Sequence, residues 1–158
     1  MTMAPPAAVV DILSSLLDAM LGSVFRFMGE GSPYLGRATA EIRRPLAEML
    51  VAERRRAREL ADLIDSLGTV PTPHPVIRDD EQYLAYLSLK FLLPRLVHEK
   101  KLQIERYENA LSAIGKESRE VGVLLAAHLD EMRRELAQLE RSANHVIAAA
   151  KGADGGAH

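Results

Sequence analysis

Apolar residues recur every three or four positions along four long stretches of the chain, which is the pattern of amphipathic α-helices. The first stretch carries them at Val10, Leu13, Leu17, Met20, Val24 and Phe27, and the second ends at Leu67 and Gly68. The third covers about residues 81–114, and the fourth about 118–150, with Leu125, Met132, Leu139 and Val146 seven apart. The pattern predicts an all-α protein, an antiparallel four-helix bundle.

Prolines and glycines set the expected helix ends. Ser32 and Pro33 suit the N-terminal cap and first turn of the second helix. Pro45 lies inside this helix and removes the bond to the Glu41 carbonyl, which predicts a kink or local break there. The segment 68–80 is rich in proline, so helix is disfavoured over much of it. This long crossover can span the bundle, and we therefore expect the second and third helices to run parallel.

The length of 158 residues suits a single domain. We expect a flexible N-terminal segment over residues 1–8, the bundle over 9–150, and a disordered tail over 151–158, where glycine and alanine are frequent and little can be buried.

The composition excludes several classes of function. The chain has no cysteine, so disulfides, thiolate metal sites and thiol nucleophiles are absent. Its formal net charge of -2 offers no field for nucleic acid. The most apolar run, Tyr83 to Val97, contains Lys90, Pro94 and Arg95 and is too short to span a membrane, which needs about 20 residues. The N-terminus lacks the basic opening of a secretory signal, so we expect a cytoplasmic location.

The second helix carries two charged residues in the middle of its core-facing stripe. The stripe consists of Ile42, Leu46, Met49, Glu53, Arg56, Leu60, Leu63 and Leu67. Charged groups at mid-bundle are where four-helix bundles build metal sites. The simpler interpretation is that a slightly rotated helix leaves Glu53 and Arg56 on the surface.

The chain resembles the ferritin-like superfamily in its helix lengths, its long crossover and the run from Ala52 to Leu60. The resemblance implies a di-metal centre with a Glu from each of two helices and a Glu-x-x-His pair from each of the other two. Here Arg56 stands where the first His belongs, and Met20 stands where the first helix would supply a Glu. Neither side chain can bind a hard metal ion, so the resemblance is to a degenerate di-metal site.

The remaining helices supply further candidates. His128 and Glu131 have the right residue types in reversed order, and the third helix offers Glu99 or Lys100. We expect a central polar cluster of Glu53, Arg56, Lys100 and His128, in which the two basic groups replace the charge of metal ions. The alternative is an iron or manganese site formed by Glu53, Glu99, His128 and Glu131. As simpler interpretations, His128 is a hydrogen-bonded core residue and Glu131 a solvated charge.

These observations favour a non-catalytic structural or binding protein with no cofactor. The alternative is a metal-binding ferritin-like oxidase or iron-binding protein, and a small-molecule pocket beside Met20 and Met132 also stays open. The third helix has more apolar residues than one buried face needs, from Tyr83 to Leu96. We expect a second subunit or the N-terminal segment to cover the excess, and because a symmetric dimer is the commonest solution, we predict a homodimer.

Overall fold

The computed structural model describes residues 6–25, 40–75 and 89–155. Over these ranges the protein consists of four α-helices with no strand: α1 (Pro6–Leu21), α3 (Ala40–Ser66), α4 (Leu89–Ile114) and α5 (Arg119–Gly155). The all-α prediction is confirmed. The expected start of the second helix at Ser32 and Pro33, and the position of Phe27, lie outside the described residues.

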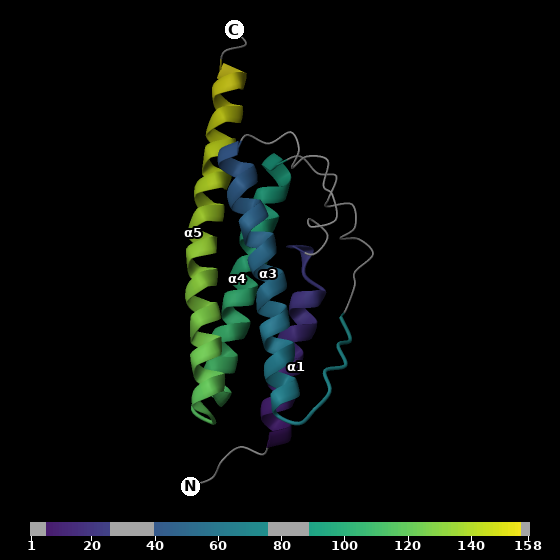
Figure 1. The fold of residues 1–158 in the computed structure, drawn as a ribbon. Helices are drawn as coiled ribbons and strands as arrows, with labels where there is room; N and C mark the ends of the chain where they lie inside the picture. The colour runs from purple at the N-terminus through teal and green to yellow at the C-terminus, as the bar shows by residue number, and fades with distance from the viewer. Residues whose placement is uncertain (1–5, 26–39, 76–88, 156–158) are drawn as a thin grey trace.

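The helices form an elongated bundle, and residues 67–75, the described part of the crossover connection, lie along one side of it (Figure 1). Neighbouring helices pack as α1 with α3, α1 with α4, α4 with α5, and α3 with α5. Figure 1 shows that each of these pairs is antiparallel, whereas α3 and α4 run in the same direction, as the long connection predicts. The described part of the connection is held to the bundle where the backbone N–H of His74 donates to Asp18 Oδ1 at 2.8 Å.

The first helix ends earlier than its apolar pattern predicts. The helix α1 stops at Leu21, and Ser23 donates its N–H back to the Met20 carbonyl at 3.2 Å. Ser23 Oγ in turn accepts the N–H of Phe25 at 3.2 Å. The single helix expected to continue past Val24 is therefore wrong, although Val24 and Phe25 are still buried.

The helix α3 continues through Pro45 without the local break that was expected there. The proline removes one backbone bond near the start of a long helix, and the remaining bonds and the buried Ile42 and Leu46 are sufficient to hold the turn. The helix ends at Ser66, and Gly68 follows with a φ of 87°, a conformation that glycine adopts without strain. Leu67 therefore lies beyond the helix and is 37% exposed, so its expected place in the core is wrong.

The helical part of the chain is longer than the expected range of 9–150. The helix α1 begins at Pro6, and α5 continues to Gly155. Proline suits the first position of a helix, where its missing N–H would have no partner. The start of α5 has a side-chain cap, since Ser118 Oγ accepts the N–H of Val121 at 3.0 Å.

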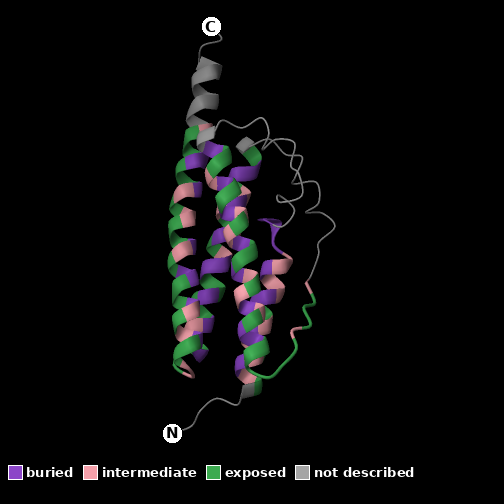
Figure 2. Ribbon diagram, in the orientation of Figure 1, coloured by how far each residue is buried: buried purple, intermediate pink, exposed green. Residues whose placement is uncertain are grey.

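The bundle core consists of two apolar clusters, with buried faces turned inward along every helix (Figure 2). One cluster lies toward the α4–α5 turn and contains Leu13, Leu60, Tyr107, Leu125 and Met132 among others. The other lies toward the opposite end and contains Phe25, Leu46, Met49, Leu92, Leu96 and Leu139 among others. Along α3, α4 and α5 a set of buried polar residues lies between the two clusters, and this polar layer is described below.

No helix within the described part of the chain is long and apolar enough to cross a membrane.

Candidate functional site

The polar layer is formed by charged and amide side chains that three helices place at the same level of the bundle. The helix α3 supplies Glu53 and Arg56, one turn apart, α4 supplies Lys100 and Gln103, and α5 supplies Glu135. Arg56 and Lys100 are 0% exposed, and Glu53 is 8% exposed. Charges buried to this extent require partners, because leaving water costs each ion several kcal/mol.

Each of the two cations bridges the same two carboxylates. Lys100 Nζ lies 2.5 Å from Glu53 Oε1 and 2.9 Å from Glu135 Oε1. Arg56 Nη2 lies 3.1 Å from Glu53 Oε1 and 2.6 Å from Glu135 Oε1, while Nη1 donates to Glu135 Oε2 at 3.0 Å. Two negative and two positive charges thus form a closed, neutral group.

Neighbouring side chains extend this group on both sides. Gln103 Nε2 lies 3.3 Å from both Glu53 Oε2 and Ser23 Oγ, which links the layer to the end of α1. The ammonium of Lys100 also lies 4.4 Å from the ring centroid of Phe25, a cation–π contact. Together these contacts hold the layer against the residues that directly follow α1.

Toward the surface, Glu131 on α5 continues the network. Arg56 Nη1 lies 3.4 Å from Glu131 Oε2, and Arg55 also pairs with this carboxylate. Arg55 further donates to Glu59 at 2.6 Å. Glu131 and Arg55 are 28% and 44% exposed, so this outer part is partly solvated.

The charge pairing decides the ionisation of the layer. Burial by itself would raise the pKa of Glu53, but the nearby charges of Lys100 and Arg56 and their hydrogen bonds outweigh it and lower that pKa. For Arg56, burial acts to lower the pKa, and the hydrogen bond and charge of Glu135 together with the charge of Glu53 more than compensate and raise it. Both groups are therefore charged near neutral pH.

His128 belongs to a separate, largely uncharged contact beside the layer. Its Nδ1 lies 3.0 Å from the hydroxyl of Tyr107, which is also 3.4 Å from Met20 Sδ. Its Nε2 lies 3.5 Å from Glu59 Oε1. Burial lowers the pKa of His128, although Glu59 opposes this effect. With its proton on Nε2, the imidazole accepts a hydrogen bond from Tyr107 at Nδ1 and turns its N–H toward Glu59, while Nε2 itself has no hydrogen-bond partner among the described residues.

The structure brings three of the four residues of the expected cluster into direct contact: Glu53, Arg56 and Lys100. His128 is buried near them but bonds to Tyr107. On α4, Lys100 rather than Glu99 lies in the polar layer.

The alternative ligand set of Glu53, Glu99, His128 and Glu131 is not gathered at one point. Glu99 faces Arg106 at 3.8 Å, away from the polar layer. His128 and Glu131 are occupied by Tyr107 and by the two arginines of α3. Among the residues that the structure describes, no group of three or more acidic and histidine side chains is placed to hold a metal ion.

Sequence reasoning missed Glu135 and Gln103. Gln103 follows Lys100 by three positions and precedes Tyr107 by four, so it continues the buried stripe of α4. Glu135 could have been found from charge balance, because two buried cations need a second buried acid besides Glu53.

The residues present do not fit the di-metal centre that the resemblance implies. The carboxylates of Glu53 and Glu135 face each other across the core as metal ligands would, but the space between them holds Arg56 Nη2 and Lys100 Nζ. A guanidinium has no lone pair to donate and stays charged at any pH that a protein survives, so it repels a metal cation.

An antiparallel four-helix bundle in which α3 and α4 run parallel is the ferritin-like fold, and the comparison with solved structures confirms this fold. The structure is similar to that of the bacterioferritin-related protein from Bacteroides fragilis, described as a dodecameric thioferritin. The TM-score is 0.72 at 19% sequence identity, over 96% of this chain and 92% of that chain. No family model matches the chain, and no curated protein matches it.

Proposed function

We propose that the protein is a non-catalytic ferritin-like bundle, a structural or binding protein whose internal ion pairs stand in for the metal ions of this fold. The single observation that carries this proposal is the bridging of Glu53 and Glu135 by both Arg56 and Lys100. A di-metal centre neutralises converging carboxylates with ions that can exchange and change oxidation state. Here the neutralising charges are covalently attached, so neither property is available.

The first experiment measures metal binding and iron oxidation. Protein purified without chelators is analysed for metal content, then mixed with ferrous iron without oxygen and exposed to air while the absorbance of ferric iron is followed. We expect no stoichiometric metal and iron oxidation at the rate of buffer alone. One or more metal ions per chain, lost on Glu53→Gln and kept on substitution of the exposed Glu105 by Gln, would overturn the proposal.

A gain-of-binding variant serves as the positive control. The double substitution Arg56→His and Lys100→Glu removes both internal cations and supplies a Glu-x-x-His pair on α3 together with a carboxylate on α4. We expect this variant, once its helix content matches that of the wild type, to bind a divalent metal ion such as Mn²⁺ or Fe²⁺ that the wild type does not bind. If the wild type binds the same metal equally well, Arg56 and Lys100 do not exclude it.

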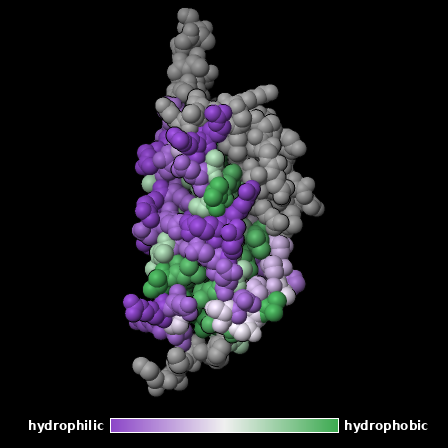
Figure 3. Space-filling model, viewed as in Figure 1, coloured by the Kyte–Doolittle hydropathy of each residue, from purple (hydrophilic) through white to green (hydrophobic). Residues whose placement is uncertain are grey.

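We further propose that the chain self-associates through α4, as its apolar excess predicts. Among the described residues of this excess, Leu92, Leu93 and Leu96 are buried within the chain and Phe91 is 63% exposed. Figure 3 shows the face over α5 and α3, behind which α4 lies, and this face mixes hydrophilic side chains with smaller apolar patches. We expect light scattering to give the mass of a homodimer, and Phe91→Ser to reduce it while Val123→Ser, which changes an equally exposed residue on α5, does not. A monomeric wild type at micromolar concentration would contradict this.

A further inference from the structure

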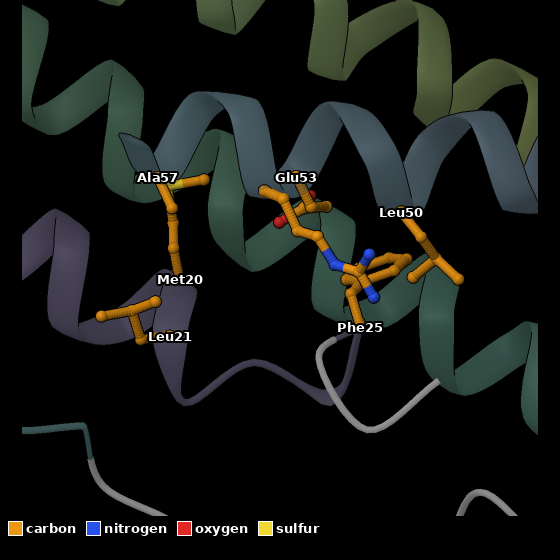
Figure 4. Close-up of a pocket in the computed structure, with 7 residues that line it drawn as sticks. Met20, Leu21, Phe25, Leu50, Glu53 and Ala57 are labelled. Carbon is orange, nitrogen blue, oxygen red and sulfur yellow. The ribbon is translucent and has the colours of Figure 1, made fainter. Parts of the chain in front are cut away.

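A small pocket opens between α1 and α3, directly beside the polar layer (Figure 4). Figure 4 shows Glu53 on α3 with Met20 on one side and Phe25 and Leu50 on the other. Its volume is about 210 Å³, and its walls are mostly apolar, with Leu21 and Ala57 completing them and Arg54 as a second charged group. The pocket thus combines hydrocarbon walls with one carboxylate.

We propose that this pocket binds a small uncharged molecule with an apolar ring or short chain and one hydroxyl group, which donates its hydrogen bond to Glu53. This inference rests on the proposed function, because a metal ion held by Glu53 would occupy the same carboxylate. Three properties of the pocket support such a ligand: its size, the hydrogen bonds still available in it, and its charge.

The volume admits a molecule about the size of phenol. A cavity of roughly 150 Å³ lined by apolar side chains accommodates benzene, so about 210 Å³ leaves room for a ring and a substituent. The same space corresponds to about seven water molecules at ~30 Å³ each, most of which would face apolar walls. Replacing poorly bonded waters by an apolar group gains affinity.

The carboxylate of Glu53 can accept a further hydrogen bond. Glu53 Oε1 accepts from Lys100 at 2.5 Å and from Arg56 at 3.1 Å, whereas Oε2 accepts only the long bond from Gln103 at 3.3 Å. An ionised carboxylate has about four acceptor directions, so Oε2 can take another donor. A ligand that supplies a donor therefore fits better than a purely apolar one.

The charges favour a neutral ligand. The carboxylate of Glu53 is already neutralised by Lys100 and Arg56, so an ammonium placed against it would lie close to both of these cations. An anion would be repelled by Glu53 itself, and Arg54, the cation that lines the pocket, already interacts with another group. A hydroxyl group donates without adding charge.

The test uses phenol as the probe and the methyl group of Met20 as the reporter. Protein labelled with ¹³C at its methionine methyl groups is titrated with phenol, benzene, benzylamine and benzoate in the presence of a chelator. We expect a saturable shift of the Met20 resonance with phenol, a dissociation constant at least tenfold lower for phenol than for benzene, and weaker binding of both charged probes. Met132, in the core away from the pocket, should not shift.

Two substitutions on α3 distinguish the pocket from the rest of the surface. Ala57→Leu fills the pocket and should abolish the phenol shift, whereas Ala52→Leu enlarges a residue that does not line it and should keep the shift. If Ala57→Leu does not fold, as judged by its circular dichroism, Leu21→Phe fills the same space from α1.

Several results would overturn the inference: no saturable shift, equal affinity for phenol and benzene, or phenol binding that survives the filling variants. Failure of the proposed function would look different. In that case a titration with ferrous or manganous ions, carried out without chelator, would shift or broaden the Met20 resonance, and the phenol result in chelator would still be readable.

Discussion

Replacing Arg56 by alanine is the most direct test of the polar layer. The substitution leaves Glu53 and Glu135 buried with Lys100 as their remaining internal cation, so the closed neutral group acquires a net negative charge. Breaking a buried ion pair by removing one partner typically costs about 3–5 kcal/mol. The loss of packing by a side chain that is 0% exposed acts in the same direction.

Arg55 is a matched control on the same helix. Its side chain is 44% exposed and pairs with Glu59 and Glu131 at the surface. Exposed ion pairs contribute roughly 0–1 kcal/mol, since water and salt screen them. Arg55→Ala and Arg56→Ala therefore remove the same chemical group from adjacent positions and differ in burial.

Thermal unfolding followed by circular dichroism, at equal protein concentration, measures the difference. For a domain of this size 1 kcal/mol corresponds to about 2–4 °C, so we expect Arg56→Ala to lower Tm by roughly 10 °C and Arg55→Ala by at most about 4 °C. Equal Tm values for the two variants would refute the reasoning, because they would show that Arg56 is as dispensable as a surface charge.

A double variant separates loss of charge balance from loss of packing. Arg56→Ala combined with Glu135→Gln removes one charge of each sign and leaves Glu53 paired with Lys100 at 2.5 Å. We expect the double variant to be more stable than Arg56→Ala alone, which a double-mutant cycle reports as a coupling energy between the two positions. Strictly additive losses would show that the two groups do not interact.

Two further predictions concern pH and packing. Burial lowers the pKa of His128 below its ordinary value of 6.5, so below that pH the unfolded chain binds a proton more readily than the folded chain does. The free energy of unfolding therefore falls as the pH drops below about 6.5. Urea unfolding between pH 7 and 5 should show this slope, reduced in His128→Gln and kept in His98→Gln; an unchanged slope in the first variant would contradict it. A Cβ at Gly122 would lie 2.5 Å from the carbonyl oxygen of Gly115, so Gly122→Ala should destabilise by about 1–3 kcal/mol, although alanine favours helix over glycine by about 1 kcal/mol. A variant as stable as the wild type in urea would count against this close contact.

The fold could be predicted because it depends on features that are local in the sequence. Apolar residues that recur every three or four positions fix the inward face of each helix. The proline-rich connection is long enough to make α3 and α4 parallel. The errors lie where a local feature competes with packing. Ser23 ends α1 by capping the next turn, although the apolar residues continue, and Pro45 fails to interrupt α3 because buried side chains on both sides hold it.

The polar layer could be predicted only in part, because rotation of each helix about its own axis is a tertiary property. Adjacent residues differ by about 100° around a helix, so a rotation by about half that angle decides which of two neighbours faces the core. On α4, the sequence therefore could not decide whether Glu99 or Lys100 faces the core. On α5 the apolar pattern gives no sign of Glu135, yet its carboxylate reaches Arg56 and Lys100 from a side chain that is 14% exposed. Charge balance across helices, rather than periodicity along one helix, is the signal that identifies Glu135.

The polar layer also explains why a helix can change its contribution to such a centre without loss of the fold. Converging carboxylates need positive charge between them, and the bundle requires only that the charge be present and hydrogen-bonded. Metal ions meet this need, and so do Arg56 and Lys100, whose Nη2 and Nζ atoms each contact both Glu53 and Glu135. Because the cations here are side chains of α3 and α4, the helices are tied directly to α5, and no exchangeable ion is required to complete the core. It follows that Arg56→His alone, or Lys100→Glu alone, should destabilise the layer. The two substitutions together should recover stability only when a divalent metal is supplied.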